Sequence, residues 1–258
     1  MIPALRSLAV LASAFAFALA GCGDDVGGGD GGKPRLTVLA AASLTEAFEQ
    51  YGGQFDAAAV RLSFAGSDEL AAQIRQGVEP DVYAAANTTL PEQLFEEDLV
   101  KKPVAFAGNR LVIAVPADSD EISSLDDLAA DGVKLAIGSE DVPVGAYTRE
   151  VLERLPGDES DAILGNVRSN EPDVSGVTGK LTQGAADAGF LYITDVAATN
   201  GRLEAIELPA RLQPSVGYGI AVVEGAEQPE AAQEFIDGLL EGRGLEAMEQ
   251  AGFEPPPK

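Results

Sequence analysis

The chain has 258 residues, with 17 Lys and Arg against 42 Asp and Glu, a formal net charge of −25, no His and one Cys. A surface this acidic repels phosphate backbones and excludes nucleic-acid binding through a basic patch. Without His there is no Ser-His-Asp or Cys-His catalytic arrangement, and a lone Cys excludes an internal disulfide. The hydrophobic share of 46% still indicates a folded chain, and the acidic balance taken alone favours a cationic ligand.

The N-terminus has the pattern of an export signal. Arg6 gives a positive start, residues 8–20 form an apolar run too short to cross a bilayer comfortably, and Leu19-Ala20-Gly21-Cys22 follows. This tetrapeptide resembles the lipobox of bacterial lipoproteins, which implies removal of a signal peptide over residues 1–21 and lipidation of Cys22. The alternative is an ordinary signal peptide with an incidental Cys. Residues 22–33, rich in Gly and Asp, are then a flexible tether to a membrane.

From residue 35 onward, short apolar runs alternate with amphipathic segments. The runs predict strands and the amphipathic segments predict helices. In chain order we expect strand 35–42, helix 44–54, strand 60–64, helix 68–76, strand 81–86, a helix whose first turn holds Pro91, strand 111–115, helix 125–130, strand 133–137, helices 147–155 and 174–183, strands 188–193 and 219–223, and helices 229–240 and 245–250. This alternation predicts α/β units on mainly parallel sheets with helices on both faces.

Four strand-to-helix turns have the composition of anion-binding helix starts. In α/β sheets, ligands lie beyond the carboxyl ends of the strands, where helix N-termini carry partial positive charge. Ser43 and Ser67 each end a strand and open a helix. For Ser43 the alternative is a capping box with Glu46, three residues later. The other two turns are 141–147 (DVPVGAY) and 171–175 (EPDVS).

The order and spacing of these turns resemble those of the periplasmic molybdate-binding proteins that feed ABC transporters. The resemblance runs from about residue 36 to residue 253, and its strongest segments are AAASLTEAF, FAGSDELAAQI, VPVGAYTREVL and GFLYITDV. It implies an oxyanion site made of the hydroxyls and amides of Ser43 and Ser67, the main-chain amides of Val144 and Val174, and the phenol of Tyr192. Neutral donors suit a fully deprotonated dianion, which only accepts hydrogen bonds. Taken alone, Tyr192 is more typical of a core or interface tyrosine.

Two residues depart from the family pattern. Asp68, directly after Ser67, stands where a small neutral residue is usual. A carboxylate there would suit hydrogen phosphate, whose proton needs an acceptor, but it also suits the first turn of a helix. Val144 replaces a residue that is usually Ala, which threatens the size of the pocket more than its chemistry.

The resemblance implies a two-lobed type II periplasmic binding protein fold with the ligand cleft between the lobes. Lobe 1 is expected to hold residues 34–112 and 221–258, and lobe 2 residues 113–220, with crossings near 111–116 and 215–223. The implied function is an extracytoplasmic, lipid-anchored, monomeric solute-binding protein. It captures molybdate or tungstate and delivers it to an ABC permease and its ATPase, with no catalysis, no cofactor and no direct metal-cation ligand.

Three alternatives remain open. The first is a phosphate- or sulfate-binding protein of the same fold. The second is an enzyme with Ser43 as nucleophile, although no base stands at a suitable spacing and only Lys or a carboxylate could serve. The third is a cation or metal receptor that uses the surplus carboxylates.

Overall fold

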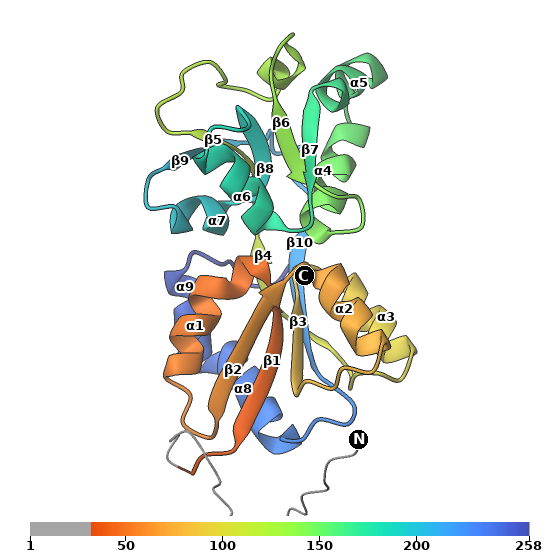
Figure 1. Ribbon diagram of the computed structural model, residues 1–258, viewed down its shortest axis with the longest axis vertical. Helices are drawn as coiled ribbons and strands as arrows, with labels where there is room; N and C mark the ends of the chain where they lie inside the picture. Colours follow the sequence, from red (N-terminus) through yellow and green to blue (C-terminus); the bar gives the residue numbers. More distant parts are fainter. Residues whose placement is uncertain (1–31, 258) are drawn as a thin grey trace, which may run out of the picture. The chain divides into compact units, whose positions relative to one another are not determined.

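Two five-stranded sheets organise the computed structural model, which describes residues 32–257 (Figure 1). The predicted signal peptide, Cys22 and nearly all of the tether lie outside these residues. The first sheet has the order β2-β1-β3-β10-β4, with β1 Arg35–Ala41, β2 Ala59–Ala65, β3 Val82–Ala85, β4 Val104–Asn109 and β10 Val216–Val222. The second has the order β7-β6-β8-β5-β9, with β5 Leu111–Pro116, β6 Leu135–Gly138, β7 Val167–Glu171, β8 Ala188–Tyr192 and β9 Leu203–Glu207.

Each sheet has one reversed strand. In the first sheet β1 pairs in parallel with β2 and β3, whereas β10 is antiparallel to β3 and to β4. In the second sheet β6 pairs in parallel with β7 and β8, whereas β5 is antiparallel to β8 and to β9. The other four strands of each sheet run in one direction, which confirms the predicted mainly parallel α/β fold.

Helices cover both faces of the first sheet. On one face lie α1 (Thr45–Gly53), α8 (Pro229–Glu241) and α9 (Arg243–Gln250), and on the other lie α2 (Ser67–Arg75) and α3 (Thr89–Glu96) (Figure 1). Phe48 and Phe235 meet edge to face in the core below α1, and Tyr83 lies in a separate cluster with residues of α2 and α3. Because both faces are covered, β1 and β3 read as nearly continuous apolar runs.

The second sheet is covered in the same way. The helices α4 (Pro143–Glu153) and α6 (Val174–Thr182) pack against β6 and β8, and α7 (Ile193–Ala198) packs against β9 (Figure 1). The helix α5 (Gly157–Gly165) lies beside a 3₁₀ turn at Asp126–Ala129. Within residues 32–257, no helix is both long enough and apolar enough to span a bilayer.

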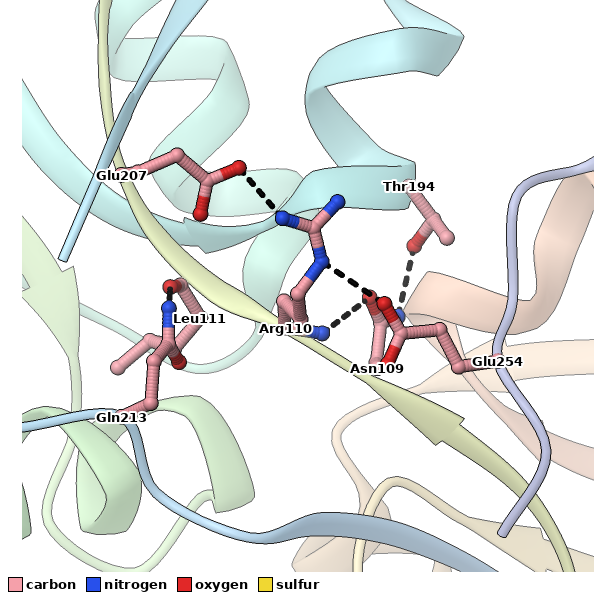
Figure 2. A network of polar contacts seen from close by, with 7 residues as sticks. All are labelled: Asn109, Arg110, Leu111, Thr194, Glu207, Gln213 and Glu254. Atoms are coloured by element: carbon pink, nitrogen blue, oxygen red, sulfur yellow. Dashed lines mark hydrogen bonds and ion pairs between the residues drawn. The ribbon is translucent and has the colours of Figure 1, made fainter. Parts of the chain in front are cut away.

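The chain passes between the sheets at Arg110 and again between β9 and β10. Arg110 forms ion pairs with Glu207 of β9, at 2.5 Å, and with Glu254 near the C-terminus, at 2.8 Å (Figure 2). All of residues 111–116 pair within the second sheet and residues 216–222 within the first. The lobe limits drawn at 112 and 220 therefore need correction, because each crossing ends just before the strand that follows it.

Five of the described helices and strands were not predicted from the sequence, because the residues of each show only a weak strand or helix pattern. The strand β4 ends in Gly-Asn, β7 has one apolar residue in five, β9 has charged residues among apolar ones, and the first half of α5 is polar. The helix α7 directly follows β8, so the strand expected at 188–193 extends one residue too far, into the helix. In addition, α4 begins at Pro143 rather than at residue 147. That earlier start places Val144 in the first turn of a helix.

Candidate functional site

All five residues predicted to hold an oxyanion line one small cavity. It lies between the carboxyl ends of strands from both sheets, and its wall includes Ser43, Ser67, Val144, Val174 and Tyr192. Its volume, for a water-sized sphere, is about 20 Å³. One water molecule needs roughly 10–15 Å³ by the same measure. The cavity therefore has room for a compact ligand of a few atoms and none for a sugar or an amino acid.

Four helix starts converge on this cavity. Ser43 lies in the 3₁₀ turn Ala42–Leu44 that leads into α1, and Ser67 is the first residue of α2. Val144 is the second residue of α4 and Val174 the first of α6. The first amides of a helix have no acceptor within that helix, and the helix dipole adds partial positive charge there. The main chain alone therefore supplies donors from both lobes.

Hydroxyl groups complete the set of donors. The Ser67 Oγ accepts a hydrogen bond from the Ala86 N–H at 3.0 Å, so its own proton remains to be donated. The Ser43 Oγ lies 2.9 Å from the Tyr218 Oη. This bond joins Ser43 to β10, and no side-chain cap is formed at this helix start, so the capping box with Glu46 is wrong.

Tyr192 is fully buried, and its Oη has no hydrogen-bond partner among the described residues. Burial raises the pKa of this phenol well above its ordinary value, so the group keeps its proton at neutral pH. The ring is held between Tyr147 and Tyr218 in edge-on contacts. A buried O–H without a partner is costly, and an acceptor in the cavity would satisfy it.

The cavity wall has no cationic side chain among the described residues. The only carboxylate in the wall belongs to Asp173, whose Oδ1 accepts the Gly176 N–H at 2.9 Å and so caps α6. The same part of the chain holds no group of three or more acidic or Cys side chains arranged to bind a metal ion. An anion in this cavity would be held by neutral dipoles.

The two departures from the family pattern have little effect on the cavity. A Cγ of Val144 lies against Gly138, where an added Cβ would come within 2.6 Å of it, so the glycine makes room for the larger side chain. Asp68 is the second residue of α2 and is not part of the cavity wall. Burial raises the pKa of Asp68, and the nearby Asp141 of the other lobe adds to this shift.

At Gly66 the two lobes meet with no space for a side chain. A Cβ added there would lie 2.5 Å from the carbonyl oxygen of Pro172, in the loop just before α6. Gly66 has φ −59° and ψ 138°, which any residue adopts, so the glycine is needed for space and not for its backbone angles. This contact sets the distance between the donors of α2 and those of α6.

Sequence reasoning missed three residues near the cavity. Tyr218 and Asn109 lie in buried strands whose apolar neighbours give no sign of a polar network. Asp195 lies at the start of α7, where its Oδ2 accepts the Tyr192 N–H at 3.1 Å. Burial raises the pKa of Asp195 to about 7, and the Tyr192 N–H opposes this shift. An acidic residue three positions after Tyr192 was the available signal.

Two α/β lobes with a donor-lined cavity between them define an extracytoplasmic solute-binding protein of the type II periplasmic class. The chain belongs to the bacterial extracellular solute-binding protein family, whose pattern matches residues 36–254. This finding confirms the resemblance and the fold inferred from the sequence. It also assigns the chain to a family of transport proteins and not to a class of enzymes.

Individual relatives cover most of the chain. The molybdate-binding protein ModA of Mycobacterium tuberculosis is 33% identical over 231 residues, which cover 87% of this chain and 86% of ModA. A putative ABC transporter substrate-binding lipoprotein of Bacillus subtilis, YvgL, is 29% identical over 253 residues, covering 94% and 96%. The substrate-binding domain of a putative molybdenum ABC transporter from Clostridium difficile superposes with a TM-score of 0.65 at 28% identity, covering 87% of this chain and 100% of that domain.

Proposed function

We propose that this protein captures molybdate or tungstate in the small cavity and delivers it to an ABC importer. The observation that carries the proposal is the convergence of four helix starts and three hydroxyls on a cavity of about 20 Å³. Among the described residues, the wall of this cavity has no cationic side chain. Such a site matches a compact, fully deprotonated tetrahedral anion. The names of the Mycobacterium tuberculosis and Clostridium difficile relatives point to molybdenum as the element carried.

The proposed ligand contacts are the hydroxyls and amides of Ser43 and Ser67, the amides of Val144 and Val174, and the Tyr192 phenol. No cofactor and no direct metal-cation ligand belong to the proposal, since the oxyanion itself is the cargo. The two sheets act as lobes that hinge at the crossings and close over the anion. The closed, monomeric form then docks on the permease, whose ATPase drives import.

Hydrogen phosphate is the main alternative ligand, and sulfate shares its size class. A phosphate proton needs an acceptor, and Asp68, which was the candidate for that role, is not in the cavity wall. Asp173 is the one carboxylate in the described part of the wall, so tight phosphate binding would point to Asp173 as the proton acceptor. Between sulfate and molybdate the bond lengths differ, so the size of the cavity should separate them.

We further propose that the protein performs no covalent chemistry. A Ser43 nucleophile needs a base, and its hydrogen-bond partner among the described residues is the Tyr218 phenol, whose pKa burial raises further. Such a phenol holds its proton and is a poor base. Hydrolysis of ester and phosphoester substrates that depends on Ser43 would contradict this proposal.

The predicted signal peptide and Cys22 support our proposal of a lipid anchor, which would hold the protein in the periplasm or on the outer face of the cytoplasmic membrane. The Bacillus subtilis relative is itself described as a lipoprotein. In cells fed a labelled fatty acid, we expect the parent chain to carry the label and Cys22→Ser to lose it. Equal labelling of both chains, or no labelling of the parent, would contradict the anchor.

Competitive calorimetric titration tests the ligand assignment. We expect molybdate and tungstate to bind tightly and to raise the melting temperature, and sulfate and phosphate to compete weakly. Calcium and zinc serve as controls for a cation receptor. Absence of both heat and thermal stabilisation with molybdate and tungstate would overturn the proposal, and tight phosphate binding would replace it with the alternative.

A further inference from the structure

A chain of hydrogen bonds connects the hydroxyl of Ser43 to the crossing between the sheets. The Tyr218 Oη, on β10, lies 2.9 Å from the Ser43 Oγ. The amide Nδ2 of Asn109, the last residue of β4, donates to the same Tyr218 Oη over 3.3 Å. The three polar groups are buried, so each bond lacks competition from bulk water.

The orientation of the Asn109 amide is fixed by its neighbours. Its Oδ1 accepts the Arg110 N–H at 2.9 Å, and a backbone N–H can be accepted only by the oxygen end of the amide. Its Nδ2 also donates to the Thr194 Oγ1 of α7, at 2.9 Å (Figure 2). The NH₂ end must therefore face Tyr218, and the Tyr218 oxygen must accept from it.

The direction of the next bond follows from the Tyr218 proton. Burial raises the pKa of Tyr218 well above its ordinary value, so the phenol keeps its proton. Among the described residues, the acceptor within reach of that proton is the Ser43 Oγ. If Ser43 donated instead, a buried phenol proton would have no partner, which is costly. Tyr218 therefore donates to Ser43, and the Ser43 proton is left to point into the cavity.

We propose that Asn109 and Tyr218 are positioning residues that orient the Ser43 hydroxyl as a donor, and that this orientation selects oxyanions without a proton over hydrogen phosphate. The inference rests on the proposed function and names the feature that sets its ligand class. Ser67 is oriented in the same sense by the Ala86 N–H. When both serines donate, the hydroxyl of hydrogen phosphate meets their protons, and Asp173 is the one carboxylate that the described part of the cavity wall offers it.

The test compares molybdate with hydrogen phosphate at pH 8, where both are predominantly dianions. The measured quantity is the ratio of their dissociation constants, because a change in local charge affects two dianions alike and leaves the ratio unchanged. Tyr218→Phe removes the donor to Ser43 at nearly constant shape. Asn109→Asp places an acceptor beside Tyr218, so Tyr218 donates to Asp and accepts from Ser43. The direction of both hydrogen bonds is then reversed, and a Ser43 lone pair turns toward the ligand. Thr194→Val is the matched control, since it removes the other partner of the Asn109 amide and leaves the hydrogen bonds from Asn109 to Tyr218 and from Tyr218 to Ser43 in place.

We expect the preference for molybdate over phosphate to fall about tenfold or more in Asn109→Asp, as for one hydrogen bond to a charged partner, and to fall in Tyr218→Phe as well. The ratio in Thr194→Val should match that of the parent. Melting curves establish that each variant is folded, and if Asn109→Asp does not fold, Tyr218→Phe decides alone. An unchanged ratio in a folded variant overturns the positioning role. A parent that does not bind molybdate overturns the proposed function instead, so the two failures are distinct.

Discussion

Replacing Gly66 with Ala should weaken ligand binding without removing any donor. The added Cβ would lie 2.5 Å from the Pro172 oxygen, whereas real Cβ atoms do not approach within 3.0 Å of such an atom. The Pro172 carbonyl belongs to the loop before α6, so the two lobes must separate or the Val174 amide must move. Overpacking of this kind costs about 1–3 kcal/mol. If the whole cost falls on the closed form, molybdate affinity drops by about 5- to 150-fold.

The open form should tolerate this change. At φ −59° and ψ 138°, Ala fits the backbone, and replacing Gly at such a site stabilises proteins by about 0.4–1 kcal/mol through the unfolded chain. The added Cβ would also lie 2.9 Å from the Asp68 Oδ1 of the same lobe, so that side chain must shift and offset part of this gain. Without ligand, the melting temperature of Gly66→Ala should therefore lie close to that of the parent. Gly157→Ala is the matched control, because no atom lies within 4 Å of its added Cβ.

Calorimetric titration with molybdate and melting curves with and without ligand make the measurement. Weaker binding at nearly unchanged stability supports the reasoning, provided that Gly157→Ala binds as the parent does. If Gly66→Ala binds molybdate within about twofold of the parent, the contact with Pro172 does not limit the bound form. A loss of stability without ligand would place the strain in one lobe and also contradict the argument.

Three further predictions concern the charge and the buried polar groups. Tyr192→Phe should weaken molybdate binding by about 10- to 100-fold, as for a hydrogen bond to a charged ligand. Stability should not fall, because the phenol has no hydrogen-bond partner among the described residues. Titration and melting curves measure both quantities, and an affinity equal to that of the parent would remove Tyr192 from the site. Because burial raises the pKa of Asp195 to about 7, its contribution to stability is present below about pH 4 and is lost as pH rises through about 7. Asp195→Asn should therefore flatten the fall in melting temperature between pH 5 and pH 8. If the melting temperatures of the variant and the parent fall in parallel over this range, the raised pKa of Asp195 is contradicted. With a net charge of −25, anion capture should become faster as ionic strength rises, which stopped-flow measurements detect; a flat or falling rate would exclude long-range repulsion.

The pattern of apolar residues along the sequence predicted the strands that lie inside a sheet covered by helices on both faces. The runs at β1 and β5 were found because nearly every residue in them is apolar. Strands β7 and β9 lie at the edges of the second sheet, where exposed residues such as Arg168 and Glu204 interrupt the pattern. Their place in the sheet comes from pairing with β6 and β5, which a local pattern does not contain.

The residues that line the cavity were recognisable because helix starts have local signatures. Ser43 and Ser67 follow apolar strands, and Pro143 marks the first turn of α4. The residues that orient them were not recognisable, since the bond between Ser43 and Tyr218 spans 175 positions. The contact between Gly66 and Pro172 likewise depends on how the two sheets face each other.

Main-chain donors make part of this site tolerant of mutation. At Val144 and Val174 the proposed contact is an amide that nineteen of the twenty amino acids possess, so most substitutions there keep the donor. Proline alone deletes it, and a proline at the start of a helix would do so without breaking the helix. Such a site can drift widely in side-chain identity while its chemistry stays constant. What selection has to preserve is the position at which each helix begins.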